Sequence, residues 1–151
     1  KNKLEPMENV DKIYGPEQMA EVFRLSDYII NLLPLTQETQ GLINKEYFNI
    51  MKPTAYFINI GRGATVNEED LVQALKEKQI QGAVLDVFTQ EPLPADHPLW
   101  QLDNVIISPH FSGSSSKYLD KVMPIIKHNL DKYLEGKTDQ MLNLVEANKG
   151  Y

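Results

Sequence analysis

The chain has 151 residues, a formal net charge of −6 and no cysteine, with 42% hydrophobic and 24% charged residues. This length suits one globular domain, and the composition excludes a largely disordered chain and gives no sign of a membrane-spanning segment. The acidic balance argues against nucleic acid as the main partner, because phosphate backbones attract clustered lysine and arginine. Without cysteine there is neither a disulfide framework nor thiolate chemistry, which agrees with a cytoplasmic protein.

The first third of the sequence predicts a helix, a strand and a second helix. A helix is expected over residues 16–26, because proline and an acidic residue favour its first turn and an apolar face follows. Residues 28–33 are almost continuously apolar and Pro34 ends the run, which predicts a buried strand. Asn44 is suited to cap a short helix over residues 45–51.

Three further strands are expected, over residues 56–60, 82–88 and 104–109. Between the first two, Asn67 should cap a helix whose first turn is acidic; the acidic residues compensate the helix dipole, and we do not interpret them as a metal site. The alternation of strands and helices predicts right-handed crossovers and a parallel sheet. The expected fold class is therefore α/β.

The last part of the sequence predicts a long helix over residues 114–134, with serines in front and Gly136 behind as caps. Pro124 should kink or restart this helix, because it removes one hydrogen bond. His97 is expected to have a structural role, and His128 to be a surface or packing residue.

Four polar side chains come at or after the ends of predicted strands. Arg62 lies between two glycines after the second strand, Asp86 and Glu91 end or follow the third, and His110 follows the fourth. The carboxyl ends of parallel strands meet at one edge of a sheet, where open α/β folds bind ligands. We therefore expect these four side chains to gather along one rim.

These residue types suit hydride transfer to a carbonyl group. Glu91 would accept a hydrogen bond from a ring nitrogen of His110, which favours a protonated ring that can act as general acid on the forming alkoxide. Arg62 would hold a substrate carboxylate by paired hydrogen bonds. His110 alone would be interpreted as structural; its two companions favour catalysis. Asp86 leaves two interpretations open, a strand-end cap or an acceptor for a nicotinamide carboxamide.

The motifs that carry these residues resemble the C-terminal portion of the D-isomer-specific 2-hydroxyacid dehydrogenases. They are Asn59-Ile60-Gly61-Arg62-Gly63, residues 85–94 and residues 108–113, together with Leu33-Pro34-Leu35-Thr36 and Met51-Lys52-Pro53. The resemblance covers nearly the whole chain, with the motifs in the family's order and spacing.

The resemblance implies an oxidoreductase that transfers hydride between NAD or NADP and a small 2-oxo acid or D-2-hydroxy acid, in the manner of glyoxylate/hydroxypyruvate reductases. It assigns substrate carboxylate binding to Arg62, acid/base chemistry to His110 and support of the histidine to Glu91. Formate-oxidising relatives carry glutamine at the position of Glu91, so the glutamate favours 2-oxo acids. A homodimer is expected, both from the habit of the family and because the absence of early strands would expose an apolar edge that a second copy could cover. The positions implied in cofactor binding are Leu33, Pro34, Thr39, Ile60, Gly61, Arg62, Asp86 and Gly113.

The family's glycine-rich phosphate-binding turn, G-x-G-x-x-G, is absent from the sequence. We therefore expect the back half of a longer protein: residues 1–136 would be a partial NAD(P)-binding domain with a doubly wound parallel sheet of Rossmann type, and residues 137–151 a C-terminal tail. The isolated chain should show no useful turnover. Two alternatives remain open, a nucleotide-sensing, corepressor-like module and a purely structural fragment.

Overall fold

The computed structural model describes residues 7–145. The chain divides into two compact units, Lys1–His110 and Phe111–Tyr151, and each is described by itself. Residues 1–6 and 146–151 lie outside the described range. The start of the expected domain and the end of the expected tail therefore also lie outside it. The expected boundary near residue 136 stays a prediction.

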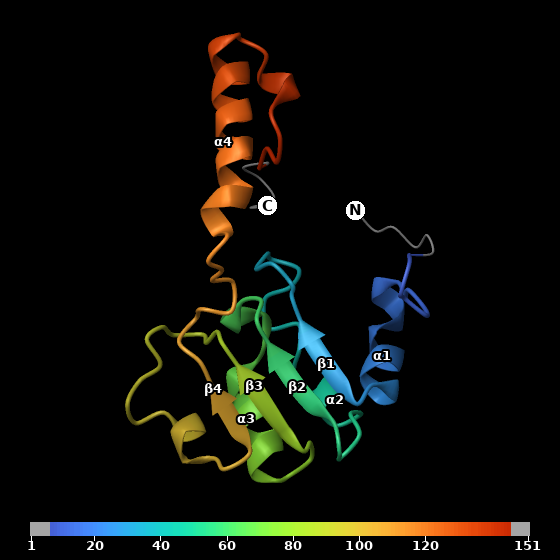
Figure 1. Cartoon of the computed structure of the whole chain (residues 1–151). Coiled ribbons are helices and arrows are strands. Elements are labelled where there is room, and N and C mark those ends of the chain that lie inside the picture. Colours follow the sequence, from blue (N-terminus) through green and yellow to red (C-terminus); the bar gives the residue numbers. More distant parts are fainter. Residues whose placement is uncertain (1–6, 146–151) are drawn as a thin grey trace. The chain divides into compact units, whose positions relative to one another are not determined.

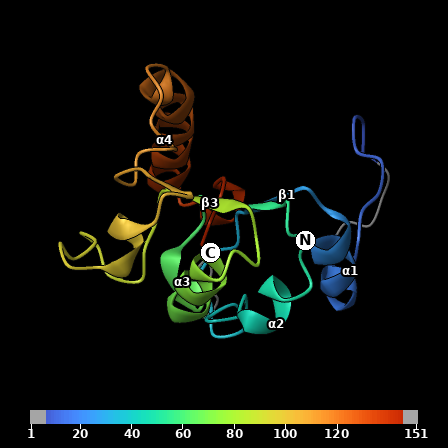
Figure 2. The same ribbon diagram turned by 90° about the horizontal axis from the view of Figure 1, so that it is seen from below.

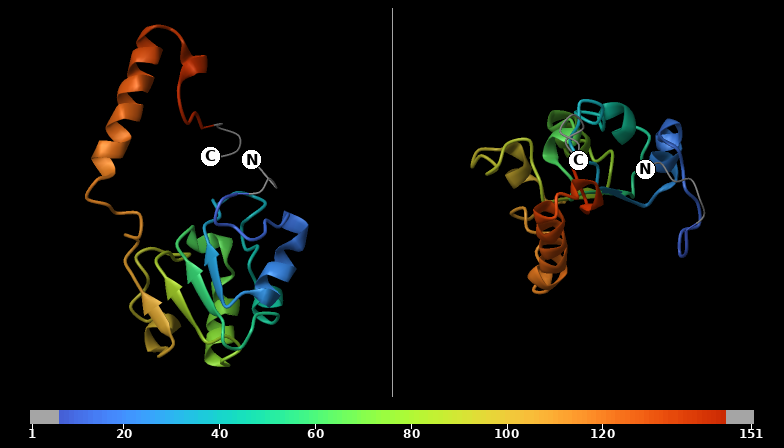
Figure 3. Two further views of the ribbon diagram at one scale, coloured as in Figure 1. Left: turned by 45° about the vertical axis from the view of Figure 1, so that its right-hand side comes forward. Right: turned by 90° about the horizontal axis from the view of Figure 1, so that it is seen from above.

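The first unit is built on a parallel sheet of four strands in the order β1-β2-β3-β4. Figure 3 shows the four strands side by side and running in one direction. The parallel α/β sheet predicted from the alternation of elements is thus confirmed, and it is of Rossmann type. The strands are β1 (Tyr28–Asn31), β2 (Tyr56–Asn59), β3 (Gly82–Leu85) and β4 (Val105–Ile107).

Helices connect these strands and cover one face of the sheet (Figures 1 and 2). The α-helices are α1 (Met19–Leu25), α2 (Lys45–Phe48) and α3 (Glu68–Lys76). Single 3₁₀ turns are η1 (Pro16–Gln18), η2 (Gly63–Thr65) and η3 (Pro98–Gln101). The chain therefore enters β2 through α2 and β3 through α3, but it enters β4 through a long loop that contains η3.

The predicted helix caps are present. The Asn44 side chain accepts a hydrogen bond from the Glu46 amide at 2.9 Å, and Asn67 accepts from the Asp70 amide at 3.1 Å. Each cap satisfies a backbone donor that the first helical turn leaves without a partner. The first of these helices ends at Phe48, earlier than the apolar spacing indicated.

The hydrophobic core lies between the sheet and its helices. Alternate strand residues such as Ile29, Phe57 and Leu85 point into it and are buried. Phe48 of α2 meets Phe57 edge to face, with ring centroids 5.5 Å apart. Removal of a buried phenylalanine side chain at such a site costs about 3–5 kcal/mol.

The opposite face of the sheet carries no helix from residues 7–110 (Figure 2). Tyr28 and Ile30 of β1 are 66% and 55% exposed, and Ile106 of β4 is 66% exposed. Tyr28 stacks on Tyr56, with ring centroids 5.8 Å apart and ring planes 10° from parallel. The apolar run at β1 is therefore buried only at alternate residues, because helices cover a single face.

The second unit consists of α4 (Tyr118–Leu134), η4 (Thr138–Gln140) and the segment after it. The helix begins later than expected: no side chain caps it, and the Ser115 hydroxyl instead accepts from the Lys117 amide in the preceding turn. It also runs through Pro124 without a restart.

The segment after α4 packs back on it by hydrogen bonds. Asn129 exchanges two of them with the main chain of Leu142, at 2.7 and 2.9 Å, and a ring nitrogen of His128 lies 3.1 Å from the Gln140 carbonyl oxygen.

Across residues 7–145, no helix combines the length and the apolar character that a membrane crossing requires.

Candidate active site

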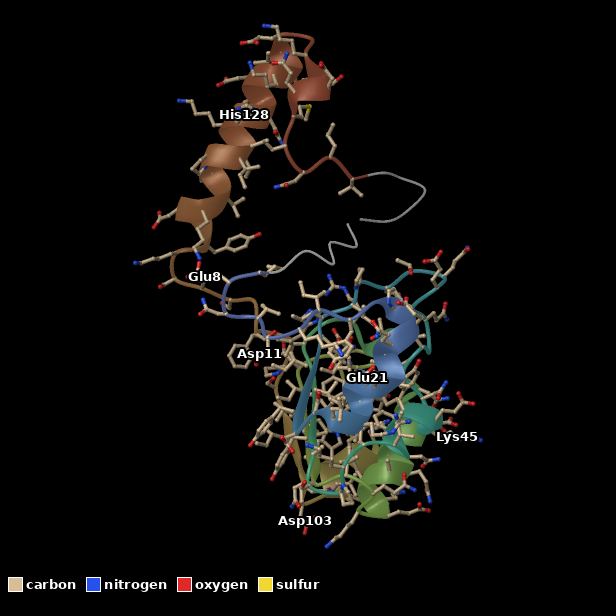
Figure 4. All side chains as sticks on the ribbon, turned by 90° about the vertical axis from the view of Figure 1, so that its right-hand side faces the viewer. Glu8, Asp11, Glu21, Lys45, Asp103 and His128 are labelled. Carbon is tan, nitrogen blue, oxygen red and sulfur yellow. The ribbon has the colours of Figure 1, made fainter. Side chains whose placement is uncertain are left out.

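The four predicted rim residues belong to the segments that leave the carboxyl ends of the strands. Arg62 follows β2, Asp86 and Glu91 follow β3, and His110 follows β4. The sheet pairing continues past the strands, because the Asp86 amide donates to the Asn59 carbonyl at 3.0 Å and the Ser108 amide to the Leu85 carbonyl at 2.9 Å. Asp103, labelled in Figure 4, marks the opposite edge, at the amino end of β4.

Glu91 and His110 are in direct contact. His110 Nδ1 lies 2.7 Å from Glu91 Oε2, and the other carboxylate oxygen, Oε1, accepts a hydrogen bond from the Phe88 amide at 2.9 Å. His110 has a φ of 53°, in the left-handed region that few residues other than glycine adopt. Such backbone strain concentrates at functional sites. The contact between Glu91 and His110 predicted from the sequence is confirmed.

The surroundings of Glu91 keep its carboxyl group ionised. The hydrogen bond to His110, the hydrogen bond from the Phe88 amide and the positive charge of Arg62 all hold the pKa of Glu91 below its usual range. An ionised carboxylate only accepts hydrogen bonds. His110 Nδ1 is therefore the donor in this pair, and Nε2 is the ring nitrogen left to exchange a proton with a ligand.

The turn that carries Arg62 packs directly on the loop that carries Glu91. Gly63 is buried, and a Cβ built on it would lie 2.6 Å from Phe88 Cα and closer still to the Phe88 carbonyl group. A Cβ on Gly61 would lie 2.9 Å from the Leu33 carbonyl oxygen. Only glycine permits these approaches. The Arg62 side chain is exposed, and its Nη1 donates to the Gly61 carbonyl at 2.8 Å.

Asp86 lies deeper than the other three residues and is 1% exposed. Its Oδ1 accepts a hydrogen bond from the Ser108 hydroxyl at 2.6 Å. Sequence reasoning missed Ser108, because its contact with Asp86 follows only from the strand register: Leu85 pairs with Ile107, which makes the next residues on the two strands neighbours. The role of Asp86 toward a nicotinamide stays a prediction.

Glu91 and His110 line a hollow of about 600 Å³. The other lining side chains are mostly apolar and include those of Phe88, Leu93, Trp100 and Ile107. A second hollow, of about 400 Å³, lies at the amino ends of the strands and contains none of the predicted site residues. The hollow beside Glu91 and His110 therefore has a largely apolar lining, which suits contact with the carbon atoms of a small ligand.

His97 lies away from the rim. Its Nδ1 accepts from the Leu99 amide at 3.3 Å at the start of η3, and its Nε2 lies 3.4 Å from Glu68 Oε1. Glu68 Oε2 in turn accepts from the Thr89 amide at 3.1 Å. These contacts tie α3 to the loop before β4, which agrees with a structural role for His97.

The positions predicted to line a cofactor groove fall at the ends of β1 and β2 and in the second unit. In the loop after β1, Thr39 Oγ1 donates to the Pro34 carbonyl at 2.6 Å and accepts from the Thr36 amide at 2.8 Å, which fixes the turn. Leu33 belongs to this loop, and Ile60 directly precedes the turn that carries Arg62. Gly113 belongs to the second unit, and a Cβ on it would meet nothing within 4 Å.

These residues fit one end of a dinucleotide. Arg62, Asp86, Glu91 and His110 supply polar groups where a nicotinamide and a small acid would meet, and Gly61 allows the two loops to approach closely. The sequence has no glycine-rich turn for a pyrophosphate. The polar groups at the rim therefore suit the nicotinamide end of the cofactor, and the glycine-rich turn that would hold its phosphate end is absent from the sequence.

Comparison with known proteins agrees with this geometry. The profile of the D-isomer specific 2-hydroxyacid dehydrogenase NAD binding domain matches residues 2–112. Glyoxylate reductase from Thermofilum pendens is 46% identical over 112 residues, which are 74% of this chain and 33% of that protein. Glyoxylate reductase/hydroxypyruvate reductase from Mus musculus is 44% identical over 119 residues, 79% of this chain and 36% of that protein.

Solved structures show the same relationship. A D-isomer specific 2-hydroxyacid dehydrogenase from Xanthobacter autotrophicus, in complex with NADPH and MES, superposes with a TM-score of 0.88 at 36% identity, covering 100% of this chain and 61% of that one. The chain spans between 33% and 49% of the length of the first curated relatives it matches. On the match over residues 2–112, the chain belongs to the D-isomer specific 2-hydroxyacid dehydrogenases.

Proposed function

We propose that this chain is the C-terminal half of an NAD(P)-dependent 2-hydroxyacid dehydrogenase that reduces glyoxylate, hydroxypyruvate or a similarly small 2-oxo acid. The observation that carries the proposal is the pairing of His110 with Glu91 at 2.7 Å at the carboxyl end of the sheet. The names of the relatives, which are glyoxylate and hydroxypyruvate reductases, support the substrate class.

The roles of the residues follow from their positions. When bound, a reduced nicotinamide would supply the hydride for the carbonyl carbon. As the carbonyl π bond breaks, the oxygen takes a proton from His110 Nε2, and the proton transfer completes the hydroxy acid. Glu91 holds the ring by Nδ1, which leaves Nε2 as the nitrogen that faces the proton transfer. Arg62 holds the substrate carboxylate and thereby fixes the face of the carbonyl that is presented.

The full-length protein that contains this chain tests the proposal. NADH or NADPH oxidation is followed with glyoxylate, hydroxypyruvate and pyruvate, for the wild type, His110→Gln and the matched control His128→Gln on α4. Loss of the general acid should lower kcat by about 10²–10⁴ in His110→Gln, and the control should match the wild type. Cofactor binding without turnover on any of these acids would favour a nucleotide-sensing module.

The isolated chain is expected to have no useful turnover. A dinucleotide carries two anionic phosphate groups, and each lost charge-assisted hydrogen bond costs about 1.5–3 kcal/mol. Turnover by these 151 residues at the rate of an intact relative would contradict this expectation.

We also propose that the protein is a homodimer in the cytoplasm. The exposed apolar face at Tyr28, Ile30 and Ile106 supports association, since exposed patches of this kind mark interaction surfaces. The absence of cysteine supports the compartment. Sedimentation of the protein as a monomer at high concentration would remove the support for the dimer.

A further inference from the structure

A buried polar cluster lies directly beneath the turn that carries Arg62. Its members are Asn31 at the end of β1, Asn59 at the end of β2 and Thr65 in η2, which are 3%, 2% and 0% exposed. Asn31 and Asn59 are partners in the sheet register. Buried polar groups are costly unless hydrogen bonds satisfy them, so this cluster calls for an explanation.

The Asn31 side chain uses all its hydrogen-bonding groups within the cluster and the adjacent loop. Its Nδ2 donates to Asn59 Oδ1 at 3.0 Å and to Thr65 Oγ1 at 2.8 Å, while its Oδ1 accepts from the Leu33 amide at 3.1 Å. Asn59 Oδ1 accepts a second bond, from the Gly61 amide at 3.2 Å. The cluster thus joins both strand ends to the loops that follow them.

Thr65 connects the cluster to Arg62 itself. The Thr65 hydroxyl accepts a hydrogen bond from Asn31, which leaves the hydroxyl proton free for donation. The hydroxyl donates this proton to the Arg62 carbonyl oxygen at 2.6 Å. The main chain is therefore held on both sides of the arginine Cα, at the Gly61 amide and at the Arg62 carbonyl. The guanidinium then bonds back to the Gly61 carbonyl, so its position follows that of the turn.

We infer that Thr65, supported by Asn31, is a positioning residue for Arg62: it sets where the guanidinium meets the substrate carboxylate. This role rests on the proposed function of Arg62. Valine has the shape of threonine without the hydroxyl, so Thr65→Val removes the shorter of the two bonds to the Arg62 carbonyl, keeps the longer one from the Thr65 amide at 3.2 Å, and leaves one Asn31 donor without its partner. Thr65→Ser keeps the hydroxyl and serves as the matched control.

The position of the guanidinium can be measured without any activity. The chain contains two arginines, Arg24 and Arg62, so the side-chain Nε–H signals in a nitrogen-15 NMR spectrum are two, and Arg24 on α1 is an internal reference. We expect the Arg62 signal to shift or broaden in Thr65→Val, to stay in place in Thr65→Ser, and the Arg24 signal to stay in place in both. An Arg62 signal that does not move in Thr65→Val would overturn the inference.

Kinetics of the full-length protein supply the second readout. Loss of one hydrogen bond that orients the arginine should raise KM for glyoxylate about 3- to 10-fold in Thr65→Val, with KM for the cofactor changed less than about 2-fold. Methylglyoxal, which lacks a carboxylate, should be affected much less, and Thr65→Ser should restore KM. Equal losses with both substrates would indicate a merely structural role and overturn the inference.

The experiments also distinguish two further outcomes: a Thr65→Val variant that does not fold, and a failure of the proposed function. If Thr65→Val does not fold, Thr65→Cys, whose thiol is only a weak hydrogen-bond donor, takes its place, and the same Arg62 signal and KM ratio are measured on it. If the wild-type full-length protein reduces no 2-oxo acid while the Arg62 signal still moves, the proposed function fails and the control of Arg62 by Thr65 stands.

Discussion

Substitution of Gly63 by alanine tests the close packing between the Arg62 turn and the Glu91 loop. The new Cβ would lie 2.6 Å from Phe88 Cα and nearer still to its carbonyl atoms, whereas carbon atoms in contact normally lie about 3.5–4.0 Å apart. Phe88 contributes main-chain atoms here, so the two loops must move apart by roughly 1 Å or more. Overpacking of this kind costs about 1–3 kcal/mol, and backbone displacement places Gly63→Ala near the upper end, at about 3 kcal/mol.

Gly15→Ala is the matched control. A Cβ on Gly15 would also meet a neighbour too closely, but that neighbour is the carboxylate tip of Glu17, which can rotate away. Urea unfolding of the 151-residue chain measures both variants. A loss of about 3 kcal/mol at a slope of about 2 kcal/mol per M lowers the midpoint by about 1.5 M, and the control should change by less than about 0.5 M. Equal midpoints for the two variants would refute the packing argument.

Three further outcomes follow from single contacts. The folded-state pKa of Glu91 is lowered, so the Glu91 carboxylate stabilises the fold above the usual pKa of a glutamate, about 4.3. This stabilisation is lost as the pH falls through the folded-state pKa. The difference in unfolding free energy between wild type and Glu91→Gln should therefore shrink from pH 7 to pH 3 in urea titrations. Ser108→Ala removes a donor to buried Asp86 and should cost about 1–3 kcal/mol of unfolding free energy, while Ser108→Thr costs less. Asn67→Ala removes the cap of α3 and should cost about 0.5–2 kcal/mol, unlike Asn67→Asp; equal unfolding midpoints for these two variants would contradict the cap assignment.

The sequence was sufficient for the fold class and the contact at the centre of the site. Alternating strands and helices predict a parallel sheet, and carboxyl ends of parallel strands share an edge. Those two rules bring Glu91 and His110 together without any knowledge of distance. The caps at Asn44 and Asn67 were predictable for the same kind of reason, because each depends on a local pattern of a few residues.

Features that depend on register or on packing were not predictable. Asn31 lies within an apolar run, and its burial against Asn59 follows only once those two residues are known to be paired. The same holds for Ser108 and Asp86. The helix that ends at Leu134 was predicted to start at the serines and to kink or restart at Pro124. It starts at Tyr118, since the Ser115 hydroxyl bonds within the preceding turn, and it continues through Pro124 without a restart.

The uncovered side of the sheet contains its own optical label. Tyr28 and Tyr56 stack there with nearly parallel rings, while the single tryptophan, Trp100, lies in the loop before β4. Any molecule that settles on that side changes the solvent around two coupled phenol rings. Occupancy of the face therefore changes the contribution of these two of the seven tyrosines to the near-ultraviolet absorption, with no dye attached and no residue replaced.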